Sequence, residues 1–301
     1  MKGYEYYQRN PTEQSYNPRE TPLTDREVSL RETYEELVRE DNNGKVRLVE
    51  ADFSDIYTTQ EIKADTESSK RIKMVSPEWR DQNERAQLLA DFIAHEGSKR
   101  GSGFFSDCEI VPTAEYDDIH NGVDMVLEIR DGEHTIRLGV DATTSPDPEK
   151  LTRKYKKQEA RLRKGTLSEL KYFQSKTDSS IRGPITRLPT VILGVSSQYI
   201  TDHAEELNVG FLKNKEPKER GSHEIATVMR NEILSQLEGQ IYFLRNMRER
   251  NEKHEKSLQK LERAHTALTR IFKKENGATP ISNAVKLNPT YQVLAGPSYR
   301  Q

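Results

Sequence analysis

The sequence predicts a mixed α/β domain with extensions at both ends. Between residues 76 and 215, segments with the patterns of a helix, a strand, a β-hairpin, a helix and a strand follow one another, which is the order of a layered α/β arrangement. Apolar residues then recur at helical spacing over residues 220–276, where we expect one long helix or a helical hairpin. Residues 1–75 are poor in aliphatic side chains, so we expect a partly disordered arm there, with one short helix, "TDREVSLRETYEELVRE", that opens at Thr24. We expect an irregular tail over residues 277–301.

The amino-acid composition excludes several classes of protein. Of the 301 residues, 33% are hydrophobic and 32% are charged, so the core is expected to be small for the length. Lys and Arg number 47 against 49 Asp and Glu, so only the distribution of charge can indicate a nucleic-acid partner. The single cysteine, Cys108, excludes an intramolecular disulfide framework and a multi-cysteine zinc site. Because no apolar leader and no apolar run of about 18 residues occurs, we expect a cytoplasmic protein without a membrane partner.

The α/β domain begins with a helix predicted for "SPEWRDQNERAQLLADFIAHEG". Ser76 can cap the free backbone amides, Pro77 suits the first helical position, and Gly97 can end the helix. The short run "DCEIVPT" then has the pattern of a strand. The buried stripe of the helix is expected to consist of Trp79, Ala86, Leu89, Phe92 and Ile93.

A β-hairpin is predicted for "HNGVDMVLEIRDGEHTIRLGVDATTS", residues 120–145. Asp131-Gly132 is a strong two-residue turn signal, because a type I′ turn needs positive φ at both central residues. A turn centred there pairs Arg130 with Glu133, so that the numbers of paired residues sum to 263. One face of the hairpin is then polar and the other is expected to face the core; the core face consists of Val123, Met125, Leu127, Ile129, Ile136, Leu138 and Val140.

This register brings two aspartates together on the polar face. Asp124 lies opposite Gly139 and diagonal to Asp141, with roughly 7 Å between the backbone positions of the two aspartates. Two carboxylates can bridge such a gap to one hard cation, Mg²⁺ or Mn²⁺. Gly139 lacks the side chain that would otherwise stand beside Asp124. An amphipathic hairpin with a solvated polar face is the alternative interpretation of the same pattern.

A strongly basic helix is predicted after the hairpin, for "PEKLTRKYKKQEARLRK", with Leu151, Tyr155 and Leu162 facing inward. The helix begins a few residues after the aspartate pair, so its basic side chains could contact the phosphate backbone of a nucleic acid bound at that pair. A charged helix face that is only solvated is the alternative interpretation. The continuous apolar run in "LPTVILGVS" then predicts a strand that is covered on both faces. The basic helix holds one acid, Glu159, and eight basic residues: Lys150, Arg153, Lys154, Lys156, Lys157, Arg161, Arg163 and Lys164.

The C-terminal helical region has an interrupted apolar stripe. The segment "RERNEKHEK" in its middle is wholly polar, so either one long exposed helix or a helical hairpin with its bend there fits the pattern. The region could form a homodimer as a coiled coil, although the polar middle argues against a continuous seam.

Over about residues 76–210 the chain resembles the PD-(D/E)XK nuclease superfamily, whose restriction-endonuclease-like core has the order helix, strand, strand, strand, helix, strand. "GVD" at Asp124 resembles the first metal-binding element, and "VDAT", with Asp141, Ala142 and Thr143, resembles the second. "EYDDIHNGVD" resembles the acidic approach to the site in divergent members. Thr143 stands where the family pattern has a lysine, and some members supply that lysine from the following helix.

The resemblance implies Mg²⁺- or Mn²⁺-dependent hydrolysis of phosphodiester bonds in DNA, with RNA as the alternative. Asp124 and Asp141 would be the metal ligands, with Asp118 or Glu115 as a further ligand, and Lys154 or Lys157 would replace the missing lysine. The competing hypothesis, which Thr143 motivates, is a catalytically inactive nuclease-like module that binds nucleic acid or serves assembly. The residues expected to contact nucleic acid are Lys150, Arg153, Lys154, Lys156, Lys157 and Arg161.

Overall fold

The computed structural model describes residues 23–42, 44–75, 78–97, 105, 108–144, 148–194 and 224–275. The helices are α1 (Asp25–Asp41), α2 (Thr59–Val75), α3 (Glu78–Gly97), α4 (Pro148–Arg163), α7 (Glu224–Arg245) and α8 (Glu252–Glu275), with short helical segments η1 (Glu50–Phe53) and η2 (Asp117–Asn121). The strands are β1 (Cys108–Pro112), β2 (Met125–Asp131), β3 (His134–Thr143), β4 (Ser168–Gln174), β5 (Arg182–Leu188) and β6 (Thr190–Gly194). Four parts of the prediction fall outside the described residues: the caps Ser76 and Pro77, the side chain of Trp79, the part of the predicted domain after residue 194, and the tail predicted for residues 277–301.

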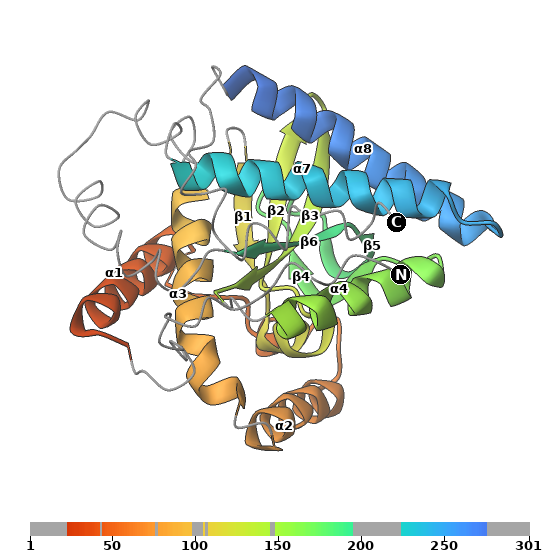
Figure 1. Ribbon diagram of the computed structural model, residues 1–301. Helices are drawn as coiled ribbons and strands as arrows, with labels where there is room; N and C mark the ends of the chain where they lie inside the picture. Colours follow the sequence, from red (N-terminus) through yellow and green to blue (C-terminus); the bar gives the residue numbers. More distant parts are fainter. Residues whose placement is uncertain are drawn as a thin grey trace.

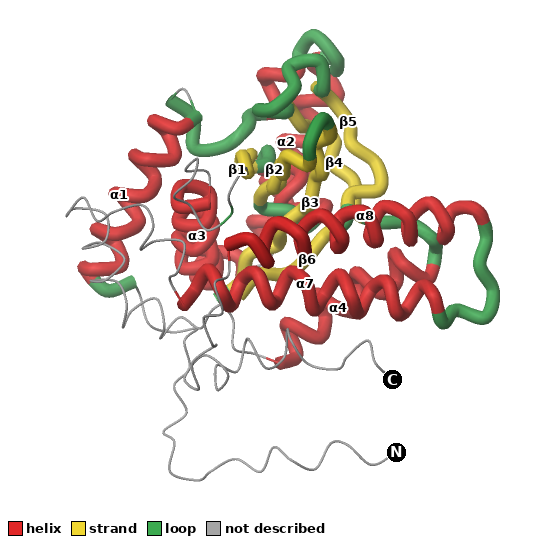
Figure 2. Tube along the Cα trace, turned by 90° about the horizontal axis from the view of Figure 1, so that it is seen from above, coloured by secondary structure: helices red, strands yellow, loops and turns green. Residues whose placement is uncertain are grey.

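The strands form a mixed sheet, which agrees with the predicted α/β class. β1, β2 and β3 pair antiparallel in sequence order, and β6 joins β3 in parallel, so the four-stranded order is β1-β2-β3-β6. β4 and β5 form a second, two-stranded antiparallel sheet. Viewed from above, β4 and β5 lie on the side of the central sheet away from α7 and α8 (Figure 2). The chain therefore has helices on one face of the central sheet and a small sheet on the other (Figure 1).

The helical face of the sheet carries the main core. The predicted inward residues of the hairpin, from Met125 to Ile129 and from Ile136 to Val140, are buried there in alternation. Residues of α1, α3, α4, α7 and α8 belong to the same apolar cluster, among them Leu89, Phe92 and Ile93 of the predicted α3 stripe. The alternation confirms the predicted core face of the hairpin for six of its seven residues, the exception being Val123.

The opposite face of the hairpin is not solvated, and the alternative of an exposed polar face is wrong. β4 and β5 cover it, so that Val126 and Val123 pack with Leu170, Phe173 and Leu188 in a second apolar cluster. The buried Glu128 carboxylate on this face accepts hydrogen bonds from Arg137 Nε (2.8 Å), Ser175 Oγ (2.6 Å) and the Lys176 amide (2.7 Å). β4 and β5 were not predicted because their pairing is irregular, with register shifts on both sides of Leu170, and their sequences do not alternate cleanly.

Within residues 1–75, the structure confirms the helix predicted to open at Thr24, which is α1 with Thr24 as its N-cap, and it adds α2, which was not predicted. α1 packs on α3 through Leu30, Tyr34 and Val38, which are nearly fully buried. Their spacing of four residues puts all three on one helix face, so a few apolar residues suffice to dock the helix. The buried Glu27 carboxylate also receives a two-pronged hydrogen bond from Arg85 of α3, at 2.9 and 3.0 Å.

The C-terminal region is a helical hairpin, not one long helix. α7 and α8 pack against each other, and the polar segment predicted to hold the bend, residues 248–256, overlaps their junction at residues 246–251. Their apolar residues, such as Leu237 and Leu261, are buried within the chain. The stripe that suggested a homodimer surface is thus used inside one copy. No helix in the described ranges is both long and apolar enough to cross a membrane.

Side chains of α7 form hydrogen bonds with the backbone amides and carbonyls on the outer edge of β6. Gln236 accepts from the Ile192 amide (2.8 Å) and donates to the Ile192 carbonyl (2.6 Å), Gln240 donates to the Thr190 carbonyl (2.9 Å), and Glu232 accepts from the Gly194 amide (3.1 Å). Four helical residues rise about 6 Å and two strand residues about 6.6 Å, so the two repeats match. The helix therefore covers an edge that could otherwise pair with another strand.

Glu232 is expected to cost stability at neutral pH. Burial raises its pKa well above the ordinary value, and a raised pKa in the folded state makes the unfolding free energy fall as pH rises through the window above about 4.3. Glu232→Gln keeps the acceptor for the Gly194 amide and cannot ionise, so at pH 7 it should raise the free energy of unfolding by about 1 kcal/mol or more. Urea denaturation at pH 5 and pH 7 measures this, with the exposed Glu238→Gln on the same helix as control. A difference from wild type that does not grow with pH would contradict the assignment.

Candidate functional site

The hairpin register differs from the prediction by two residues. Met125 pairs with Val140 and Asp131 with His134, so the numbers of paired residues sum to 265 and the turn residues are Gly132 and Glu133. Gly132 has φ +64°, whereas Glu133 is not among the positive-φ residues, as in a type II′ turn with glycine at its first central position. A shift by an even number keeps every strand side chain on its face, which explains why the predicted core survives the error.

The corrected register brings the two aspartates closer than predicted. Extending it by one pair puts Asp124 directly opposite Asp141 rather than diagonal to it. The Asp124 amide donates to the Val140 carbonyl (2.8 Å), and its carboxylate accepts from the Ala142 amide (2.5 Å). Asp124 is thus held against the strand that carries Asp141.

Gly139 has a different role from the one predicted. It pairs with Val126, not with Asp124. A Cβ atom on Gly139 would lie 2.9 Å from Leu188 Cδ2 and 3.1 Å from Thr190 Oγ1. The missing side chain therefore makes room for the packing of β5 and β6, and does not clear the aspartate site.

The turn η2 holds a third aspartate at the pair. Asp117 anchors η2 to β4 because its carboxylate accepts hydrogen bonds from the amides of Lys171 and Tyr172, both at 2.8 Å. Its neighbour Asp118 lies close enough to Asp124 to raise the pKa of the Asp124 carboxyl. Gly122 ends η2 with φ +64°, a left-handed conformation that suits glycine. Asp118, one of the two further ligands expected from the resemblance, therefore lies beside Asp124.

Arg47, which nothing in the sequence indicated, lies against Asp118. Its Nη1 donates to Asp118 Oδ2 (3.3 Å) and its Nη2 to Gln87 Oε1 of α3 (2.5 Å), and Gln87 in turn donates to Asp91 (2.8 Å). Burial disfavours the Arg47 cation, but Asp118, Asp124 and Asp91 outweigh burial and raise its pKa. Burial also raises the pKa of Asp91 to about 7. Arg47 and Asp118 are 71 residues apart in the sequence, so no local sequence pattern could have predicted that they pair.

Two lysines of α4 reach the aspartates. Lys154 Nζ donates to Asp141 Oδ1 and lies 3.5 Å from the Ala142 carbonyl oxygen. Lys157 Nζ lies 3.5 Å from the His120 carbonyl oxygen and 3.5 Å from the position that a Cβ on Gly122 would occupy. Lys154 and Lys157 are one helical turn apart, so they share a face of α4. The structure brings together Asp124, Asp141, Asp118, Lys154 and Lys157.

Electrostatics distinguish the members of this group. Burial raises the pKa of Asp124 well above its ordinary value, and Asp118 and Asp141 raise it further. Burial also raises the pKa of Asp141, against the opposing effect of Lys154. Burial acts against the Lys154 cation, but Asp141 and Asp124 outweigh burial and raise its pKa. Burial and Arg161 lower the pKa of Lys157. Lys154 is therefore a permanent cation at neutral pH, and Lys157 is the lysine that loses its proton more readily.

The remaining predicted residues lie around or away from the group. Glu115 forms an ion pair with Lys73 of α2 (2.8 Å). Arg161 donates to Ser168 Oγ (2.7 Å) and to the Asn121 carbonyl (3.0 Å), which ties α4 to β4 and η2. Lys150 is partly buried in the first turn of α4, and Arg153 and Lys156 are exposed. Thr143, at the place of the family's lysine, is buried with 4% exposure.

Neither a ready-made metal cluster nor a known relative identifies the site. Within the described residues, no group of three or more His, Cys, Asp or Glu side chains is arranged to hold a metal ion. No family model, no curated protein and no solved structure matches this chain. What the site can do has to be argued from its own residues.

Neutralising one aspartate should stabilise the protein when no divalent ion is present. Asp124→Asn removes one of the buried like charges and keeps an oxygen that can accept from the Ala142 amide. We expect a gain of about 1–2 kcal/mol in the free energy of unfolding, by analogy with other uncompensated buried charges. Urea denaturation in EDTA measures it, with the exposed Glu36→Gln on α1 as a control expected to change stability by less than about 0.5 kcal/mol. A loss of stability in Asp124→Asn would mean that its neighbours favour the ionised form.

Proposed function

We propose that this chain is a nuclease that hydrolyses phosphodiester bonds of DNA with the help of Mg²⁺ or Mn²⁺. The observation that carries the proposal is the burial of Asp124 beside Asp141 with Lys154 against them. Hard cations prefer carboxylate oxygen, and carboxylates whose pKa values are raised by burial and by a neighbouring carboxylate are held at a cost that a cation would offset.

The order of elements supports the same proposal. α3, β1, β2, β3, α4 and β6 follow the helix, strand, strand, strand, helix, strand order of the PD-(D/E)XK core, with β4 and β5 inserted between α4 and β6. In this comparison Asp124 stands at the start of the second core strand and Asp141 near the end of the third. We therefore propose that the chain belongs to the PD-(D/E)XK superfamily.

The residues fit a divalent cation. Asp124 and Asp141 would hold it, with the Ala142 carbonyl oxygen as a neutral donor, and Asp118 lies beside Asp124 without completing a group of three carboxylate ligands. When bound, the ion would supply a Lewis acid that lowers the pKa of an attacking water and offsets the charge of the scissile phosphate. Glu115 is less well placed than Asp118, because it pairs with Lys73.

The chain's own cations have separate tasks. Lys154 keeps its proton at neutral pH, so it orients the attacking oxygen as a hydrogen-bond donor and stabilises negative charge at the phosphate. Lys157, whose pKa is lowered, lies closer to the exposed side of α4 and contacts the phosphate backbone. The exposed Arg153 and Lys156 extend the same basic helix for the approach of nucleic acid.

A module that binds nucleic acid without cutting it is the second candidate. The observation in its favour is Thr143, which is neutral and buried where the family pattern has a lysine. In that case Lys154 serves only as the counter-ion of Asp141. Binding would then be sensitive to salt and would need no divalent ion.

Metal binding and cleavage measured on the same samples test the proposal. Calorimetric titration of Mg²⁺ or Mn²⁺ should show binding by the wild type that Asp124→Asn/Asp141→Asn abolishes, and the wild type should cleave plasmid or oligonucleotide DNA. A wild type that binds no metal and cuts neither DNA nor RNA would overturn the nuclease and leave the binding module.

Replacing Lys154 separates a catalytic lysine from a structural one. Lys154→Ala should lower the rate of metal-dependent cleavage by about 100-fold or more while substrate binding in EDTA changes little. The matched control is Lys70→Ala, an exposed lysine of α2, which should cleave as the wild type does. Equal cleavage by Lys154→Ala and the control would exclude Lys154 and direct attention to Lys157.

A further inference from the structure

A second group of cations lies where α8 crosses β5. Lys260 and Arg263 of α8 are exposed, and Arg187 of β5 is partly buried. Partial burial of its amine lowers the pKa of Lys260, and Arg263, Arg137 and Arg187 lower it further. Like charges thus gather at a place where α8 packs on β3 and β5. Such a gathering costs free energy unless an anion offsets it.

The acids around this group are already engaged. Glu262 pairs with Arg245 (2.7 Å), and Asp131 pairs with Arg270. Glu252, which also interacts electrostatically with Arg187, pairs with Lys256 (2.5 Å). Arg137 is itself neutralised by Glu128 (2.8 Å). In the part of the chain that the structure describes, no ion pair involves Lys260, Arg263 or Arg187. The group keeps a net positive charge that is open to a ligand.

Arg187 has an unusual backbone conformation. Its φ is +55°, the only positive value among the described residues that are not glycine. Left-handed conformations are costly for residues other than Gly, Asn and Asp, and they concentrate at functional sites. The strain at Arg187 is a second observation, independent of charge, at the same place.

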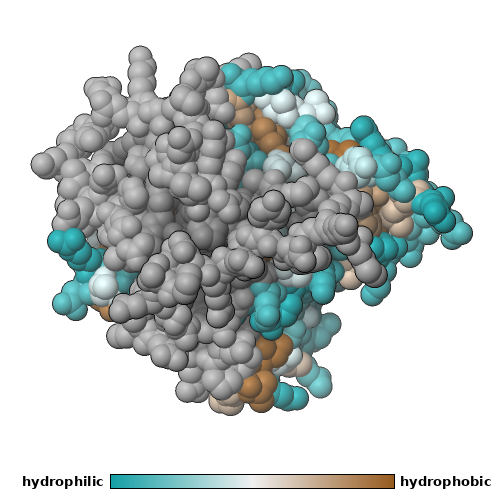
Figure 3. Space-filling view, in the orientation of Figure 1, coloured by the Kyte–Doolittle hydropathy of each residue, from teal (hydrophilic) through white to brown (hydrophobic). Residues whose placement is uncertain are grey.

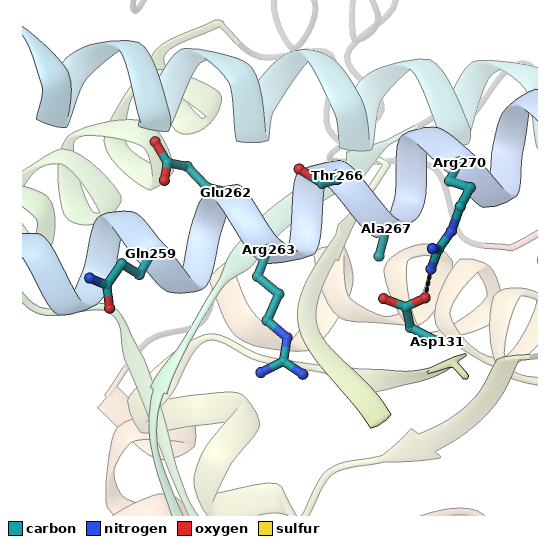
Figure 4. A pocket seen from close by; sticks show the side chains of 7 residues that line it. All are labelled: Asp131, Gln259, Glu262, Arg263, Thr266, Ala267 and Arg270. Atoms are coloured by element: carbon teal, nitrogen blue, oxygen red, sulfur yellow. Dashed lines mark ion pairs between the residues drawn. The ribbon is translucent and has the colours of Figure 1, made fainter. Parts of the chain in front are cut away.

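A shallow pocket of about 330 Å³ adjoins the cations on α8. Figure 4 shows Arg263 extending from α8 on the side away from Glu262, next to the ion pair of Arg270 with Asp131. Gln259 and Thr266 add neutral hydrogen-bonding groups to the lining, and its two carboxylates, Asp131 and Glu262, are paired with arginines. A guanidinium with neutral donors beside it suits a phosphate group, whose oxygens accept several hydrogen bonds.

The basic surface of α8 lies next to the end of the basic helix α4. His254 Nε2 lies 3.2 Å from the Arg163 carbonyl oxygen, and Ser257 Oγ donates to the Gly165 carbonyl (2.9 Å), so the first turns of α8 rest on the end of α4. Figure 3 shows hydrophilic residues over the outer end of the α7–α8 hairpin. From Lys253 to Arg263 the helix rises about 15 Å, which matches about four nucleotides along one strand of DNA. This extent fits a polymer of phosphates better than one small anion.

We propose that α8 and β5 form a second nucleic-acid contact, in which Lys260, Arg263 and Arg187 bind the phosphodiester backbone. The class of ligand rests on the proposed function, whereas the residues are separate from the carboxylate site. The contact lets the protein hold nucleic acid on a surface that extends from α4 over α8.

Binding measured in EDTA tests this contact without requiring cleavage. Lys260→Gln/Arg263→Gln should weaken binding of a labelled DNA duplex about tenfold at 0.1 M salt, and the slope of log affinity against log salt should fall by about 1.8, as expected for two lost phosphate contacts. The matched control is Lys70→Gln/Arg71→Gln, which removes one exposed lysine and one exposed arginine from α2. α2 lies at the opposite end of the molecule from α8 (Figure 1), so the control should bind as the wild type does.

Three results would overturn the inference. The first is equal binding and equal salt dependence for the α8 variant and the control. The second is a wild type that binds no nucleic acid. The third is inorganic phosphate that binds the wild type and not the α8 variant while DNA binding is unchanged, which would assign a small-anion site. Failure of the nuclease looks different, because DNA binding would then remain sensitive to the α8 variant in a protein that shows no metal-dependent cleavage.

Discussion

The antiparallel pairing of β2 with β3 is the interaction on which both the core and the candidate site depend. Its register directs Met125 and Leu127 toward the helices and Val126 and Glu128 toward β4 and β5. A slip by one residue would exchange the two faces, so that the Glu128 carboxylate would enter the helical core without its donors. Because both faces are buried, packing fixes the register from two sides, and the same register sets Asp124 opposite Asp141.

The candidate site is held together by opposite charges from distant parts of the chain. Two carboxylates, Asp124 and Asp141, lie in surroundings that disfavour their ionisation, and Asp118 lies beside Asp124. Arg47 from the segment before η1 and Lys154 from α4 compensate part of this charge. Burying so much charge gives the fold little stability. A site that costs stability is the kind that function maintains.

Periodicity in the sequence accounts for much of the architecture. The alternation in the hairpin predicted which side chains enter the core, and the continuous apolar run at Val191–Leu193 predicted a strand covered on both faces. The polar segment around Arg250 marked the bend between α7 and α8. The same approach missed β4 and β5, whose bulges interrupt the alternation. It predicted α1 as a helix but not its docking on α3, for which three apolar residues on one face are enough.

The sequence by itself determined the aspartate pair and the basic helix, because both lie within one stretch in which strand and helix periods fix which side chains share a face. The hairpin pattern predicted Asp124 and Asp141, and the resemblance implied Lys154 and Lys157, but the turn position and hence the pairing of Asp124 with Asp141 came only with the structure. Tertiary structure alone decided that Arg47 reaches Asp118 and that Arg187 meets α8. Contacts between segments so far apart in the chain leave no local pattern, since they arise only when the layers pack.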